Sequence, residues 1–352
     1  MPADVNRELS VPLVSQGAPF VRVEHTATSS KPEAASIRRD VYVYINVFSV
    51  SEITTATETF DAHFYIRACW VEPGLQPGQR IEESTWKPCI MFMNPASNPE
   101  IEDENFEVMS SRKGPDGSTV LKWAAKVRGT FREQFELRAF PFDVQPLSIW
   151  VSTQHMNVRL HEDTFDGTKS LMREEFMSLP EFLLSGPFFL PKAELALDKY
   201  PILGIQFVAK RKFPYHLFNI YFPLFLLSGM LFSSFAVGPT EPGDRIPLTL
   251  TVVLASVAYK YIVSQDLPRI SYLTLCDTYV LANFPFSALV VFQNAYVSMA
   301  ASSDPDGTEE RDSQWYYGLL ALFLGGHVFY ILVGLYFFYD ERKKLYERRH
   351  LA

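Results

Sequence analysis

The chain has 352 residues, 47% of them hydrophobic, and a formal net charge of −8 at pH 7. That length suffices for two domains. The clusters of basic residues do not indicate a nucleic-acid partner. They flank long apolar runs, where they would anchor the chain at a membrane surface. Three cysteines without metal-ligand spacing exclude a dense disulfide framework, and we expect neither a metal site nor a cofactor.

The first half of the chain is predicted to be all-β. Residues 1–37 are rich in Ser, Pro and Ala, and we expect a flexible arm there. From Arg38 onward apolar and polar residues alternate with a period of two, which is typical of half-buried strands. We therefore predict an immunoglobulin-like sandwich over residues 38–212. Its strands are expected at Val41–Val50, Thr54–Trp70, Ile90–Met93, Phe106–Ser110, Thr119–Phe131, Leu147–Thr153 and Ile202–Lys212.

Three further features belong to this half. Lys113–Gly117 has the Gly and Pro content of a hairpin turn. Asp163–Pro187 lacks regular alternation and is expected to be a long connection. Cys69 and Cys89 can form a disulfide only if their strands are neighbours, which leaves their pairing open.

The second half contains four long apolar runs, at Phe213–Val237, Ile246–Val263, Tyr272–Val297 and Trp315–Tyr339. Each run has the roughly 20 residues that a helix needs to cross a bilayer. We predict a four-helix transmembrane domain over residues 213–339, followed by a basic tail over residues 340–352. The positive-inside count, taken alone, would place the first domain and the C-terminus in the cytoplasm.

The second run differs from the other three because one helical face carries an acid, a hydroxyl and a leucine along a single stripe. Such a stripe can line a water-filled path, with residues compatible with lipid elsewhere. The alternative is an inner bundle helix whose Thr and Ser side chains bond back to its own carbonyls. The predicted pore-lining residues are Asp244, Pro247, Thr251, Leu254, Ala258, Tyr261, Ile262 and Gln265.

Four short motifs occur in a fixed order before and at the first run. They are Trp70–Glu72, Trp86–Pro88, Phe140–Gln145 and Lys210–Asn219 followed by Pro223. Together with four apolar runs, this order resembles the pentameric ligand-gated ion channels, the Cys-loop receptor superfamily.

The departures from the family pattern point to one branch of that superfamily. Glu133 and Leu147 stand where the cysteines of the family's disulfide would fall, and the connection Ala300–Gln314 between the last two spans is short and acidic. These departures resemble the prokaryotic branch, and the second run is most similar to a cation-selective member of it.

The resemblance implies five identical copies around one pore in the plasma membrane, in contact with lipid. It places the sandwich and the C-terminus outside the cell or in the periplasm, against the positive-inside count, because long domains translocate largely regardless of nearby charge. A ring of Asp244 carboxylates would attract monovalent cations. Asp244 could instead cap its helix, and Pro242 leaves anion selectivity as an alternative. Leu254 would form a hydrophobic gate.

The family's agonist site lies between neighbouring sandwiches, and its gating residues lie where the sandwich meets the membrane domain. Aromatic faces there attract ammonium groups, whereas Arg67 and His155 favour a carboxylate or a proton as the trigger. Packing within the sandwich is the alternative role for the aromatic residues. The predicted agonist contacts are Tyr65, Arg67, Phe92, Met93, Gln154, His155 and Tyr200. The predicted gating residues are Phe140, Pro141, Phe142, Asp143, Arg211 and Pro268.

The sequence therefore predicts a ligand-gated, cation-selective channel rather than an enzyme, since no nucleophile–base pair, metal cluster or phosphate loop stands out. An anion-selective or proton-gated member of the same family is one alternative. A membrane transporter with an extracellular β domain is another. It is less favoured, because Pro223 and Pro285 break the first and third runs and do not form an inverted pair.

Overall fold

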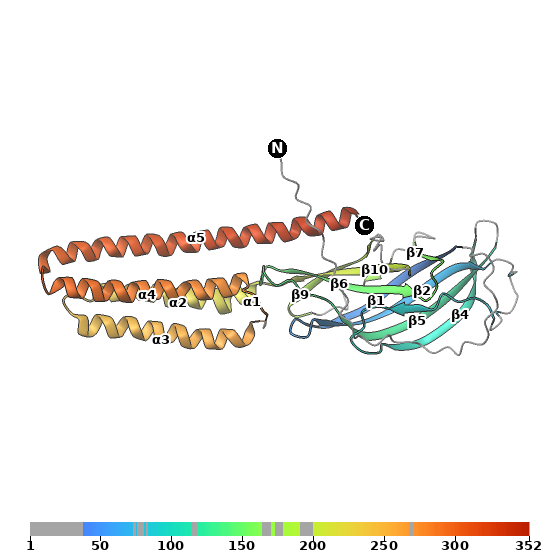
Figure 1. Ribbon diagram of the computed structural model, residues 1–352, viewed down its shortest axis with the longest axis horizontal. Coiled ribbons are helices and arrows are strands. Elements are labelled where there is room, and N and C mark those ends of the chain that lie inside the picture. The colour runs from blue at the N-terminus through green and yellow to red at the C-terminus, as the bar shows by residue number, and fades with distance from the viewer. Residues whose placement is uncertain are drawn as a thin grey trace, which may run out of the picture.

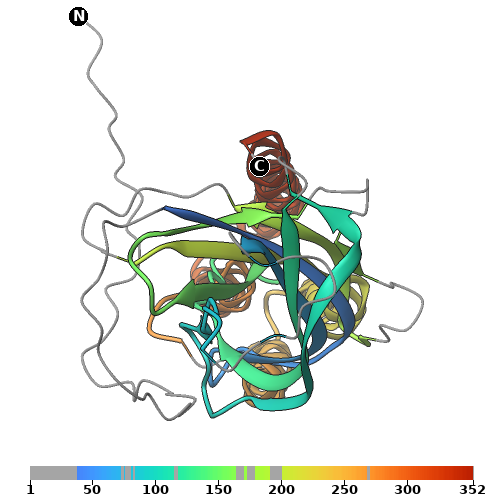
Figure 2. The same ribbon diagram turned by 90° about the vertical axis from the view of Figure 1, so that its right-hand side faces the viewer.

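The computed structural model describes residues 38–72, 75, 81, 84–114, 118–163, 170–172, 179–190, 200–267 and 270–351. The predicted arm at residues 1–37 lies outside this set. The molecule is elongated, with a β domain at one end and a bundle of long helices at the other (Figure 1). Seen from the β end, the helices lie behind the sheets (Figure 2).

The β domain contains two sheets. The first has the order β4-β5-β2-β1-β7, with β8 also pairing to β1, and the second has the order β3-β6-β10-β9. The strands of the first sheet are β1 (Arg39–Thr54), β2 (Thr59–Glu72), β4 (Glu100–Lys113), β5 (Thr119–Arg132), β7 (Val158–Glu162) and β8 (Leu171–Met172). Those of the second sheet are β3 (Ile90–Phe92), β6 (Val144–Thr153), β9 (Phe182–Leu190) and β10 (Ile202–Arg211).

Alternation along the strands sends every second side chain into the space between the sheets, as the period of two predicts. Along β1, Val41, Val43 and Ile45 are fully buried, while the residues between them are half-buried on the outer face. An aromatic cluster fills the interior, where the ring of Phe131 lies 5.9 Å from Phe60 and 6.0 Å from Phe64. The predicted all-β sandwich is confirmed.

Two parts of the strand prediction differ from the structure. Asp163–Pro187 is not an irregular connection throughout, because β8 lies within it and β9 begins there at Phe182. The residues Gly186-Pro187 hid β9, since both types are rare inside strands, and they are tolerated because β9 is an edge strand of its sheet. β4 and β5 pair antiparallel as the hairpin signal predicts, although residues 115–117 of the turn lie outside the described set. Cys69 and Cys89 do not form a disulfide with each other.

The second half forms four helices that are long and apolar enough to cross a membrane, as predicted: Pro214–Ala236, Pro242–Gln265, Leu275–Ala301 and Gly307–Asp340. The first is built from α1 (Pro214–His216), a π-helical turn η3 (Leu217–Tyr221), α2 (Phe222–Met230) and a 3₁₀ segment η4 (Leu231–Ala236). The others are α3 (Pro242–Asp266), α4 (Leu275–Ala301) and α5 (Pro305–Leu351). α5 begins ten residues before the predicted run and continues through the basic tail.

Direct hydrogen bonds join the two domains. The backbone N–H of Leu275 donates to the carbonyl of Arg138 at 2.9 Å, and that of Leu137 donates to the Tyr272 hydroxyl at 2.9 Å. A capping box of Thr274 and Asp277 starts α4 beside these contacts. The start of α4 is thereby fixed to the loop before β6, so a movement of either is transmitted to the other.

Replacing Phe131 by Ala should destabilise the β domain by about 3–5 kcal/mol, because the cavity left among its aromatic neighbours cannot collapse fully. The check is the midpoint of thermal unfolding of the purified protein, followed by tryptophan fluorescence. The control is Met156→Ala, since that side chain is more than half exposed. Equal midpoints for the two variants would contradict the aromatic cluster as the centre of the core.

Candidate functional site

α3 has two distinct faces. The buried face consists of Arg245, Thr249, Val252, Ser256 and Val263, at helical spacing. All eight predicted pore residues lie on the opposite side of the helix and are exposed in the single chain, with Leu254 69% and Tyr261 70% exposed. An exposed Asp and Thr on the same stripe as Leu254 suit a face turned to water rather than to lipid. The pore-lining role of this stripe remains a prediction.

The residues at the start of α3 bear on the alternative role of Asp244 as a helix cap. Glu241 is the N-cap residue of α3. Asp244 lies exposed in the first turn, where its carboxylate interacts favourably with the helix dipole but does not cap the helix. Thr251 donates to the Pro247 carbonyl at 2.8 Å, as the bundle-helix alternative expects, yet it stays exposed. Arg245, next to Asp244, is fully buried and forms an ion pair with Asp312 of α5.

The predicted agonist residues fall into two groups on different sheets. Phe92 ends β3 and Met93 follows it, Gln154 and His155 follow β6, and Tyr200 precedes β10. These three strands are neighbours in one sheet. Met93 is 42% and Tyr200 44% exposed.

Two members of this group have contacts inside the domain. Phe92 packs edge-on against Phe64 and Phe131, as the packing alternative expects, and its contact with an agonist remains a prediction. The His155 imidazole lies 5.1 Å from the Trp86 ring, and its Nε2 is 3.0 Å from the Lys87 carbonyl oxygen.

The second group, Tyr65 and Arg67, lies on the outer face of β2 in the other sheet. The Arg67 guanidinium donates to the buried Asp163 carboxylate at 2.9 Å and lies 4.6 Å above the Tyr44 ring. Its buried Nε has no hydrogen-bond partner within the part of the chain that the structure describes. A single chain therefore does not bring the two groups together. A complete site would need two copies side by side.

The predicted gating residues that the structure describes lie where the sandwich meets the membrane domain, and all of them except the half-buried Phe142 are buried. The Arg211 guanidinium donates to both carboxylate oxygens of Asp143, at 2.8 Å from Nε and 3.3 Å from Nη2, and both side chains are at most 5% exposed. The guanidinium also lies 4.9 Å above the Phe140 ring and 3.3 Å from Glu181. Pro141 follows a cis peptide bond. Pro268 lies outside the described residues.

Phe142 extends this cluster toward the membrane helices. Its ring lies 5.2 Å from Phe213 at the start of the first span. It also packs so closely on Gly334 of α5 that a Cβ on that glycine would lie 3.2 Å from the ring. The loop before β6 therefore touches the first and the last membrane helix.

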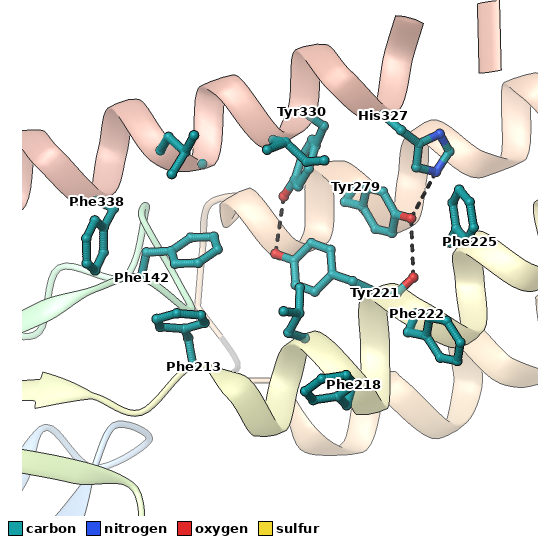
Figure 3. A pocket seen from close by; sticks show the side chains of 14 residues that line it. Phe142, Phe213, Phe218, Tyr221, Phe222, Phe225, Tyr279, His327, Tyr330 and Phe338 are labelled. Carbon is teal, nitrogen blue, oxygen red and sulfur yellow. Dashed lines mark hydrogen bonds between the residues drawn. The ribbon is translucent and has the colours of Figure 1, made fainter. Parts of the chain in front are cut away.

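An apolar cavity of about 530 Å³ lies beside Phe142 and Phe213, among η3, α2, α4 and α5 (Figure 3). Its few polar groups bond to one another: the Tyr221 and Tyr330 hydroxyls are 3.2 Å apart, and the Tyr279 hydroxyl is 3.1 Å from His327 Nε2. Sequence analysis missed this cavity, because its lining comes from segments far apart in the chain. The tyrosines inside otherwise apolar runs were the only available signal.

Among the described residues, no group of three or more His, Cys, Asp or Glu side chains could hold a metal ion.

The known proteins to which this chain is similar include several receptor subunits. The chain is 27% identical over 298 residues to the gamma-aminobutyric acid receptor subunit rho-3 of Homo sapiens, covering 79% of this chain and 62% of the relative. It is 25% identical to the rho-1 subunit of Mus musculus, covering 79% and 60%, and 25% identical to the rho-2 subunit of Homo sapiens, covering 83% and 65%. The chain thus spans about three fifths of the length of the relatives it matches. No family model matches it.

Proposed function

We propose that this chain, which belongs to the Cys-loop receptor superfamily of pentameric ligand-gated ion channels, is one subunit of a homopentameric channel opened by a small agonist. Its four membrane-length helices fit a multi-pass protein of the plasma membrane, with the β domain outside the cell or in the periplasm. Residues 38–212 would form the agonist-binding domain and residues 213–339 the pore domain. The observation that carries the proposal is the exposed polar stripe of α3, opposite that helix's buried face.

The proposed pore is built from five copies of α3. Packing of each buried face against α2, α4 and η4 leaves the stripe free to face a shared axis. Thr251 and Ala258 would meet water. A ring of five Leu254 side chains would close the pore to ions, because a narrow apolar ring excludes water. Tyr261 and Ile262 would form an outer constriction.

For selectivity we propose monovalent cations, on the charge balance at the inner end of α3. Asp244 and Glu241 are exposed, whereas Arg245 is buried and paired. Each subunit therefore presents acidic groups at this mouth, which hold cations and repel anions. Anion selectivity remains the alternative, which relatives named as gamma-aminobutyric acid receptors and Pro242 keep open.

For the agonist we propose a small amino acid with separated ammonium and carboxylate groups, bound between two copies. The relatives are named as receptors of gamma-aminobutyric acid, a compound of that kind. Arg67 offers a guanidinium with an unpartnered, buried Nε for the carboxylate. Tyr65 of the same copy and Tyr200 of the neighbouring copy would attract the ammonium group through their ring faces. Gln154 and His155 would border the site.

Current recorded across a planar bilayer tests the agonist proposal. Gamma-aminobutyrate should evoke current, whereas n-butylamine, which lacks the carboxylate, should need a clearly higher concentration. Arg67→Lys should raise the half-maximal gamma-aminobutyrate concentration about tenfold or more, since a lysine cannot form the two-pronged contact. Arg128→Lys, an exposed arginine on the neighbouring β5, is the matched control. Equal responses to the two compounds would contradict a carboxylate contact.

The ring of carboxylates is tested by Asp244→Asn. Under a salt gradient the reversal potential of the wild-type current should lie near the cation equilibrium potential. In the variant the reversal potential should move at least halfway from that value toward zero. Asp304→Asn, which removes an exposed acid just before α5, should leave the reversal potential unchanged. Reversal of the wild type near the chloride potential would keep the channel and overturn cation selectivity.

Gating is tested by Arg211→Ala. This change should abolish agonist-evoked current while pentamers remain in the membrane, because the contact between Asp143 and the start of the first span is lost. Lys212→Ala, which removes an exposed charge one residue away, should retain current. Surface labelling and gel filtration would confirm assembly of both variants, and normal gating of Arg211→Ala would contradict the proposed coupling.

A further inference from the structure

A buried polar network surrounds Arg245 at the inner end of the helix bundle. The Arg245 side chain is fully buried, although the neighbouring Asp244 is exposed. Its Nη1 and Nη2 donate to the two carboxylate oxygens of Asp312 at 2.9 and 2.7 Å, and its Nε donates to the Asn294 side-chain oxygen at 2.8 Å. Every nitrogen of the guanidinium therefore has a partner inside the bundle.

The partners of Arg245 are themselves held in place. The Gln293 amide donates to Asp312 at 2.9 Å, and the Asn294 amide donates to the Thr249 hydroxyl at 2.7 Å. The Phe235 ring covers the guanidinium at 4.8 Å. Side chains from η4, α3, α4 and α5 thus fix one two-pronged ion pair, the strongest geometry open to arginine and a carboxylate.

The position of this pair matters for the charge at the inner mouth. Arg245 follows Asp244 directly, so an extended Arg245 side chain would reach the same water as the Asp244 carboxylate. The positive charge of Arg245 so close to the Asp244 carboxylate would largely cancel the attraction of that carboxylate for a permeating cation. Held against Asp312, Arg245 forms a neutral pair whose field falls off much faster with distance than that of a single charge.

We propose that Asp312 of α5 determines the charge selectivity of the pore from outside it. It is a positioning residue: it holds the Arg245 charge inside the bundle, so that Asp244 alone sets the potential at the inner mouth. This inference rests on the proposed channel function. It assigns a role in selectivity to a helix that contributes no residue to the predicted pore stripe.

The test is the sodium-to-chloride permeability ratio of Asp312→Asn, from reversal potentials in a salt gradient. Asparagine keeps the shape but removes the charge, and a buried arginine without its counter-charge is strongly disfavoured. Arg245 should turn toward water, and the ratio should fall at least fivefold. The matched control is Asp304→Asn, an exposed acid near the same helix end that pairs with exposed Arg311. Its ratio should equal that of the wild type.

A double variant, Arg245→Gln with Asp312→Asn, guards against misfolding because it leaves no unpaired charge in the bundle. Its permeability ratio should lie within about twofold of the wild type, whereas a direct effect of Arg245 on the pore would raise the ratio well beyond that. A cation-selective wild type whose ratio survives Asp312→Asn overturns this inference alone. A silent or chloride-selective wild type instead refutes the function proposed above. If Asp312→Asn does not assemble, the double variant decides.

Discussion

Two buried arginine–aspartate pairs fix the two ends of the membrane domain, and the rest of the structure depends on them. Arg211, at the end of β10 just before the first span, pairs with Asp143 of the loop before β6, and Arg245 of α3 pairs with Asp312 of α5. Breaking such a pair by removing one partner costs about 3–5 kcal/mol, because a charge is left without compensation. Each pair therefore acts as a fixed point, and the helices between them have few ways to rearrange.

The orientation of α3 follows from the pair of Arg245 and Asp312. Because Arg245 must reach Asp312, the side of the helix that carries it also buries Thr249 and Ser256 against the bundle. The opposite side, with Asp244 and Leu254, is left without a partner in the single chain. Acids and hydroxyls on such a side are stable in a membrane only when they meet water or another subunit. Assembly around a shared aqueous axis satisfies that requirement.

The pair of Arg211 and Asp143 has a different consequence. The loop that carries Asp143 also carries Phe142, which packs on Gly334 of α5 and borders the apolar cavity. A movement of the sandwich would therefore change the cavity, the first membrane helix and α5 together. In such an arrangement two discrete packings, rather than a continuous deformation, are expected to correspond to the closed and open states.

Local patterns carried most of the fold prediction. Alternation and long apolar runs are properties of neighbouring residues, so the sandwich and the four spans could be predicted from them. β9 could not, because Gly186 and Pro187 conceal an edge strand. Asp312 also escaped prediction, because it lies in a stretch whose acids indicate a loop, whereas the structure makes that stretch the first turns of α5, with Asp312 buried among exposed neighbours.

The site was predicted less completely than the fold, because its parts meet only in space. The family resemblance placed Arg211 and Asp143 at the same domain junction, and the structure shows them in contact there. The predicted agonist residues lie on two different sheets, so only an interface with a second copy could bring them together. The cavity has no local signature, since its lining runs from Phe142 to Phe338.

The most direct test of the central claim is the accessibility of the α3 stripe in the conducting protein. Thr251→Cys would be treated with a charged, water-soluble methanethiosulfonate while agonist-evoked current is recorded, with Val253→Cys, on another face of α3, as the comparison. We expect rapid block of the current through Thr251→Cys and no change in the current through Val253→Cys. Persistent current through a fully modified Thr251→Cys protein would show that the stripe does not line the pore.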